Sequence, residues 1–136
     1  MYIKDNKFIF SPSDLTQFVE SEFASWMEHF VKENPDQSPT PDETDSMMGL
    51  LQVKGDKHEH EVLEKMIADG LNVADLTDSE DKVQATIEAM KEGFDVIFQA
   101  CLIKAPFKGY SDFLVKVPGE CKLGDYHYEV WDTKLS

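Results

Sequence analysis

The spacing of the hydrophobic residues changes at Gly93, and this change limits the folds that the chain can form. Before Gly93, apolar residues in two segments, 11–34 and 46–70, recur every three or four residues, as they do along an amphipathic helix. After it, aromatic and β-branched residues gather in runs that favour strands. These runs are 94–103, 109–117 and 126–136. We therefore predict an α+β fold, with N-terminal helices followed by a small mixed or antiparallel sheet.

Capping and turn residues indicate where the first elements begin and end. Ser11 suits the N-cap of the first helix, with Pro12 at its first helical position. Prolines and acidic residues predict a loop over 33–45. The segment 46–70 fits one long helix or two short ones, with Gly70 as the C-terminal cap.

Two shorter elements are expected between this segment and the strands. The run 71–76 reads as a short strand. The segment 77–93 has the spacing of a helix, opened by Thr77 or Ser79 and closed by Gly93.

The length and charge of the chain exclude several classes of protein. Its 136 residues suit a single domain over 1–136, and its net charge is −14, with 13 basic residues that are all lysine. Such a chain lacks the arginine forks that grip phosphates, which argues against a non-specific coat for nucleic acid. No apolar run approaches the roughly 20 residues of a membrane span, and no signal peptide is evident. We expect a cytoplasmic protein without membrane contact.

The two cysteines predict neither a disulfide nor a thiolate metal site. Cys101 and Cys121 are twenty residues apart in a chain with the character of a cytosolic protein, where thiols usually stay reduced. Two thiols are also too few for a four-thiolate zinc or iron–sulfur site. We therefore expect both thiols to be free.

Two aspartates in the last two predicted strands are candidates for a metal site. Asp112 interrupts an apolar run, and Asp132 and Lys134 lie two residues apart, on one face of a strand. Pairing of the strands would bring Asp112 close to Asp132. Two adjacent carboxylates repel each other unless a cation is present, and Mg²⁺ or Mn²⁺ prefers such oxygen ligands. Lys134 would then orient an attacking water. The alternative is an ordinary surface pair of acids.

A third acid lies on the predicted helix over 46–70. On a helical wheel, Glu59 falls near the middle of the apolar face formed by Met48, Leu51, Val62, Leu63, Met66 and Ile67. A carboxylate there is costly unless it is paired or bound to a metal. His58 lies at the edge of the same face and is a second candidate ligand. Alternatively, the helix starts after Gly55, and both residues lie in an exposed first turn.

The order of these residues resembles that of the PD-(D/E)xK nuclease superfamily, in which a helical Glu or His precedes a strand Asp and then a D-x-K motif. More narrowly, the chain resembles the RecB-like nucleases, which are often fused to a superfamily-1 helicase. Five blocks carry the resemblance in order and together cover nearly the whole chain. They are FSPSDLTQFVESEFASWM, LQVKGDKHEHEVL, ATIEAMKEGFDVIFQACL, FKGYSDFLVKV and LGDYHYEVWDTKLS.

The resemblance implies a divalent-metal-dependent DNA nuclease with a restriction-endonuclease-like core. It implies that Asp112 and Asp132, with Glu59 or His58 from the helix, hold Mg²⁺ or Mn²⁺, and that Lys134 is the catalytic lysine. It also implies DNA as the substrate and a helicase as a partner. The sequence assigns no role to the polar residues Gln99 and Tyr110.

The chain departs from the RecB-like pattern at two places. Ser21 stands where members of the group often carry a cysteine of an iron–sulfur cluster, which argues against such a cluster here. The sequence ends two residues after Lys134, whereas the group continues with a helix bearing a Q-x-x-x-Y motif. A C-terminally truncated core is therefore expected, and activity of this chain alone is in question.

Two other functions compete with a nuclease. One is a catalytically inactive interaction module with the same fold, favoured by the acidic surface and the absent helix. The other is an acidic mimic of DNA that blocks a basic protein, for which net charge is the only support. A sheet that ends at the strand carrying Asp132 also presents an edge, which favours pairing between copies of the chain.

Overall fold

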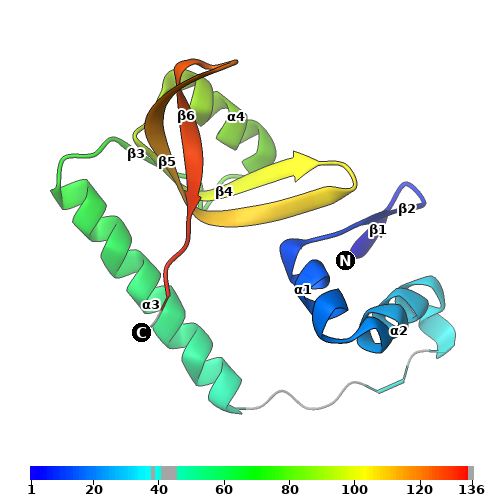
Figure 1. Cartoon of the computed structure of the whole chain (residues 1–136). Helices are drawn as coiled ribbons and strands as arrows, with labels where there is room; N and C mark the ends of the chain where they lie inside the picture. The colour runs from blue at the N-terminus through cyan, green and yellow to red at the C-terminus, as the bar shows by residue number, and fades with distance from the viewer. Residues whose placement is uncertain (38, 41–45, 135–136) are drawn as a thin grey trace. The chain divides into compact units, whose positions relative to one another are not determined.

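A computed structural model describes residues 1–37, 39–40 and 46–134 (Figure 1). The chain forms two compact units. We call Met1–Glu43 with Ile103–Gly109 the N-terminal unit, and Thr44–Leu102 with Tyr110–Ser136 the sheet unit. Two compact units can be parts of one domain or two separate domains, so the prediction of a single domain over 1–136 stays a prediction.

The N-terminal unit begins with a hairpin that the sequence analysis did not predict. Strand β1 (Tyr2–Lys4) pairs antiparallel with β2 (Lys7–Ile9). The two residues between the strands, Asp5 and Asn6, have φ values of 52° and 59°. Positive φ at both central residues is typical of the type I′ turn that joins twisted strands. The chain therefore does not begin with a helix.

The predicted helix over 11–34 is two helices, so the prediction of one continuous helix is wrong. Helix α1 (Pro12–Glu20) and helix α2 (Glu22–Glu33) meet at Ser21, whose backbone is extended. The Ser21 hydroxyl accepts a hydrogen bond from the Ala24 amide at 3.1 Å and so caps α2. A short 3₁₀ turn, η1 (Pro35–Gln37), follows.

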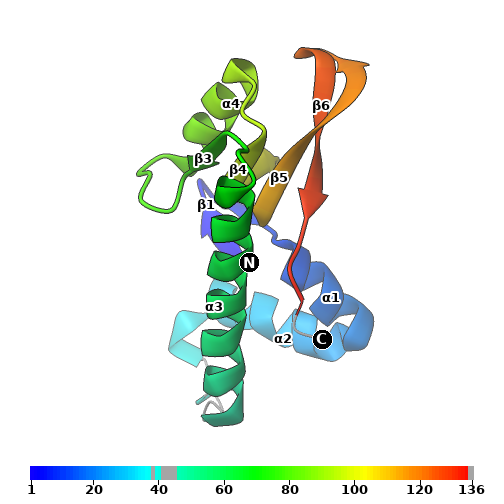
Figure 2. The same cartoon turned by 90° about the vertical axis from the view of Figure 1, so that its left-hand side faces the viewer.

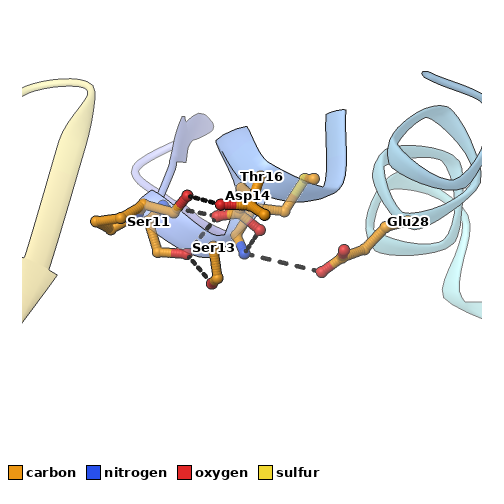
Figure 3. Close-up of polar contacts among 7 residues, drawn as sticks. Ser11, Ser13, Asp14, Thr16 and Glu28 are labelled. Atoms are coloured by element: carbon orange, nitrogen blue, oxygen red, sulfur yellow. Dashed lines mark hydrogen bonds and ion pairs between the residues drawn. The ribbon is translucent and has the colours of Figure 1, made fainter. Parts of the chain in front are cut away.

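The start of α1 agrees with the sequence prediction, because Ser11 is the N-cap and Pro12 the first helical residue. Buried Asp14 accepts hydrogen bonds from the Ser11 amide at 2.6 Å and the Ser11 hydroxyl at 2.8 Å. The amino group of Met1 donates to the same carboxylate at 2.8 Å and lies 3.8 Å from Glu28 (Figure 3). Burial raises the pKa of Asp14, but these hydrogen bonds outweigh it and lower the pKa overall.

The sheet unit is built on a mixed sheet with the strand order β3-β4-β5-β6. The strands are β3 (Val73–Asp75), β4 (Val96–Lys104), β5 (Phe107–Cys121) and β6 (Gly124–Trp131). Strand β3 is parallel to β4, and β5 is antiparallel to β6. This confirms an α+β chain with a small mixed sheet. The last predicted strand, 126–136, is corrected, because β6 ends at Trp131; Leu135 and Ser136 lie outside the described residues.

Helix α4 (Lys82–Glu92) connects the parallel strands β3 and β4. Its N-cap is Asp81, whose carboxylate accepts from the Gln84 amide at 3.1 Å, so neither Thr77 nor Ser79 opens it. Thr77 instead donates its amide to Asp75 at 2.9 Å, which uses it in a turn. Gly93 closes α4 in the left-handed conformation, with φ of 79°, as predicted.

Helix α3 (Ser46–Ala68) is one continuous helix of 23 residues, which decides between the one-helix and two-helix predictions. Its C-terminal half lies against the sheet, and its first half extends away from it (Figures 1 and 2). Consequently Met48 and Leu51 are exposed, contrary to prediction, as is Ile67 near the other end. Nowhere in the described ranges is a helix both long and apolar enough to cross a membrane.

Two buried clusters hold the helices onto the sheet. The cluster on the α3 side contains Leu63, Val96, Phe98 and Phe113. The cluster on the α4 side contains Leu76, Ala89, Ile97, Ala100 and Leu114. Strand β4 contributes to both clusters, because its residues 96–98, 100 and 101 are almost completely buried. Strand β4 is therefore a central strand of the sheet, and α3 and α4 pack against its two faces.

Candidate functional site

Asp112 and Asp132 come together through the pairing of β5 with β6. Their antiparallel register sets Phe113 opposite Trp131 and Leu114 opposite Val130. One further step in this register sets Asp112 opposite Asp132, and the two carboxyl groups are hydrogen-bonded to each other. The predicted proximity of the two aspartates is therefore confirmed, although Asp132 lies just beyond the end of β6 rather than in it.

The pKa values of these two carboxyl groups move in opposite directions. Burial, the hydrogen bond with Asp132 and the negative charge of Glu59 raise the pKa of Asp112 to about 6. The hydrogen bond from Asp112, followed by that from Lys134, lowers the pKa of Asp132. At mildly acidic pH, Asp112 is therefore protonated and donates a hydrogen bond to the Asp132 carboxylate. The two groups titrate as a pair.

Lys134 forms an ion pair with Asp132. Its side chain is 81% exposed, so it reaches the Asp132 carboxylate from solvent. The hydrogen bond to Asp132, and then the negative charge of Asp132, raise the pKa of Lys134. The alternation of side chains along a strand predicted both residues on one face of a strand. Strand β6 ends at Trp131, so Asp132 and Lys134 lie beyond the strand, and their ion pair brings them together.

Glu59 is half-buried on the side of α3 that packs on the sheet. It shares this side with Val62 and Leu63, which contact the core. The helical wheel is confirmed on this point, and the alternative of a helix that starts after Gly55 is wrong, because α3 starts at Ser46. The Glu59 carboxylate accepts a hydrogen bond from the Gln99 amide on β4.

The two histidines beside Glu59 have different surroundings. His58 is half-buried. Among the described residues of α3, Glu59 is the one whose charge raises the pKa of Asp112. His60 contacts the Asp56 carbonyl oxygen through Nδ1 at 2.8 Å, and its ring meets that of Phe98 edge to face at 5.8 Å. The structure thus brings Glu59 to the aspartates, while a ligand role for His58 stays a prediction.

Comparison of the chain with protein-family models, with curated proteins and with solved structures finds no match. The resemblance to RecB-like nucleases therefore stays a prediction from the sequence. The chemistry of the site follows from its own residues.

The oxygen donors of the site are of the kind that a hard divalent cation prefers. Glu59, Asp112 and Asp132 offer only carboxylate oxygens, which suit Mg²⁺ or Mn²⁺. Within the part of the chain that the structure describes, no group of three or more His, Cys, Asp or Glu side chains is close enough to hold a metal ion. Burial is the largest cause of the raised pKa of Asp112, followed by the hydrogen bond with Asp132 and the negative charge of Glu59.

Gln99 is the residue of this site to which the sequence analysis assigned no role. It lies in the central strand between fully buried Phe98 and Ala100, and its side chain reaches Glu59. A signal was present, because a glutamine inside an otherwise apolar strand needs a polar partner. The identity of that partner depends on how α3 lies on the sheet, which the sequence pattern does not state.

Proposed function

We propose that this chain is a divalent-metal-dependent DNA nuclease of the RecB-like type, with a restriction-endonuclease-like core. One observation carries the proposal: the register of β5 with β6 sets Asp112 opposite Asp132, and Glu59 of α3 lies near enough for its charge to help raise the pKa of Asp112 to about 6. These are the acids that the PD-(D/E)xK order singles out, and they come from α3, from β5 and from the residue that follows β6. Perturbed carboxyl groups that converge in this way are typical of functional sites.

Each residue has a role in this proposal. Asp112, Asp132 and Glu59 hold the cation. When bound, Mg²⁺ or Mn²⁺ polarises the phosphate and lowers the pKa of a bound water. Lys134 lies beside Asp132 and is open to solvent, so it orients the attacking water and stabilises its hydroxide form. A superfamily-1 helicase is the partner that the resemblance suggests, and it would bring the DNA-binding surface that an arginine-free chain lacks.

Metal binding is the first test of this proposal. Thermal unfolding is followed in EDTA and with increasing Mg²⁺ or Mn²⁺, because a ligand that binds the folded state raises the melting temperature. We expect the parent chain to gain stability and Asp112→Ala to gain little. An Asp112→Ala protein that responds to metal as the parent does would contradict the site.

Cleavage is the second test. Single- and double-stranded DNA are incubated with the chain and either metal, with Asp132→Ala and Lys134→Ala as controls. We expect metal-dependent cleavage that both substitutions abolish. Metal binding by the parent without cleavage of either DNA would favour the inactive interaction module instead. Salt-sensitive binding to a basic protein, with no metal response, would favour the DNA mimic.

A further inference from the structure

The backbone of Gln99 is unusual for a residue in a strand. Its φ is 57°, in the left-handed region, although it lies within β4 and carries a side chain. Residues other than glycine adopt this conformation at a cost in free energy, and such residues gather at functional sites. The neighbours Phe98 and Ala100 are completely buried, so the irregularity lies in the core and not at a frayed end.

This conformation changes which way the strand's side chains point. Val96 and Phe98 belong to the cluster on the α3 side, and Ile97 to the cluster on the α4 side, as strict alternation requires. Ala100 should then share a face with Phe98, but it belongs to the α4 side. Gln99 therefore acts as the extra residue of a β-bulge, a feature that redirects a side chain.

The backbone after the bulge is hydrogen-bonded in a way that supports this reading. The Cys101 amide donates to the hydroxyl of Thr86 on α4 at 3.0 Å. Thr86 is completely buried and also donates to the Lys82 carbonyl oxygen at 2.6 Å. A side chain of α4 thus satisfies a buried amide two residues beyond Gln99, on the face opposite to α3.

With the bulge in place, the Gln99 amide meets α3. Its Nε2 donates to Oε1 of Glu59, which is itself near enough to Asp112 for its charge to act on that carboxyl group. A hydrogen bond from a second residue to a ligand carboxylate fixes the direction of its free oxygen. In this arrangement Oε2 of Glu59 remains for a cation.

We propose that Gln99 is a positioning residue for the candidate metal site: its left-handed backbone turns its amide to α3, and that amide orients the Glu59 carboxylate toward the cation. The inference rests on the proposed function, because it assumes that Glu59 is a ligand. It adds a residue that supports the ligand and explains why a strained conformation persists in the central strand.

The test is the affinity for Mn²⁺, measured by isothermal titration calorimetry. Gln99→Gly removes the amide while glycine adopts the same positive φ without steric cost, so the bulge is kept. Gln99→Asn also accepts positive φ and keeps an amide, but its side chain is one methylene too short to reach Glu59. We expect both variants to bind Mn²⁺ about tenfold more weakly than the parent.

Thr86→Val is the matched structural control. It disturbs the same part of β4 from the α4 side, so it lowers the melting temperature in EDTA but leaves Mn²⁺ affinity unchanged. If Thr86→Val weakened Mn²⁺ binding as much as Gln99→Gly does, the effect would reflect general damage to β4, and the inference would be wrong.

Two outcomes separate this inference from the proposed function. If the parent chain does not bind Mn²⁺, the metal site itself fails. If the parent binds Mn²⁺ and a folded Gln99→Gly or Gln99→Asn protein binds it equally well, only the role of Gln99 fails. Tighter binding by either variant would show that the amide competes with the cation, which also overturns the inference.

Discussion

The carboxyl groups of Asp112 and Asp132 are hydrogen-bonded to each other at the end of β6, and their pKa values move in opposite directions. Strand register brings the two groups together, and burial of Asp112 makes it the one that keeps the proton. The negative charge of Glu59 adds to this effect. Because burial and the neighbouring acids oppose ionisation of Asp112, ionisation of this group destabilises the folded state near neutral pH.

The first prediction concerns the pH dependence of stability in EDTA. Because the folded-state pKa of Asp112 is raised to about 6, its contribution to stability is full below pH 4 and is lost as pH rises through about 6. Asp112→Asn removes this loss. We expect Asp112→Asn to raise the free energy of unfolding at pH 7 by about 1–2 kcal/mol, because partial exposure of Asp112 to solvent weakens the effect. At pH 4 the free energy of unfolding should change little.

Urea unfolding at the two pH values measures this difference. Asp125→Asn is the control, since Asp125 is an exposed acid on the same strand pair. An Asp112→Asn protein that is less stable than the parent at both pH values would show that the carboxyl pair stabilises the fold rather than straining it.

The second prediction separates the role of Lys134 from stability. Its side chain is 81% exposed and contacts Asp132, so Lys134→Ala should shift the melting temperature by less than about 2 °C. If Lys134 activates the attacking water, DNA cleavage should fall by about 100-fold or more. Thermal shift with Mn²⁺ and a cleavage assay give the two readouts.

Lys122→Ala is the matched control for Lys134→Ala, because Lys122 is an exposed lysine in the turn between β5 and β6. It should keep both stability and cleavage. Equal loss of cleavage in the two variants would mean that general positive charge, and not the position of Lys134, is what cleavage requires.

The third prediction concerns the buried hydroxyl of Thr86. Thr86→Val keeps the shape of the side chain but removes the acceptor of the Cys101 amide, which leaves a buried donor without a partner. We expect a loss of about 1–3 kcal/mol in the free energy of unfolding. Thr86→Ser keeps the hydroxyl and loses only a methyl group, so it should cost less. The reverse order, measured by urea unfolding, would show that packing and not the hydrogen bond decides this position.

The fourth prediction concerns Asp14 in the N-terminal unit. Its pKa is lowered, so its contribution to stability is full above pH 4 and is lost as pH falls through the folded-state pKa. Asp14→Asn should cost about 1 kcal/mol at pH 7 and less at pH 3, because the amide cannot replace a charged acceptor at the start of α1.

Fluorescence of Trp26 in α2 reports this loss, in a Trp131→Phe background that leaves one tryptophan. Asp36→Asn is the control, since Asp36 is an exposed acid in η1. If Asp14→Asn cost as much at pH 3 as at pH 7, the charge of Asp14 would not be what stabilises α1.

Local sequence patterns predicted much of the fold because their physics is local. Glycine accepts the left-handed conformation that closes α4, so Gly93 marked a helix end correctly. The N-terminal hairpin carries a weaker local signal, because Asp5 and Asn6, which accept the positive φ of its turn, lie between two short runs that each contain apolar residues. Helical spacing continues through Ser21, and spacing alone does not distinguish a bent pair of helices from one helix.

The chain's sequence by itself determined the α+β order, the half-buried place of Glu59 on its helix and the approach of Asp112 to Asp132. The first two follow from repeats of two and of about 3.6 residues along the chain, and the third from the pairing of the last two strands. Only the tertiary structure decided that Gln99 contacts Glu59, since this contact joins a bulged strand to a helix forty residues away in sequence. Periodicity states which face a residue occupies, and packing across faces decides which residue it meets.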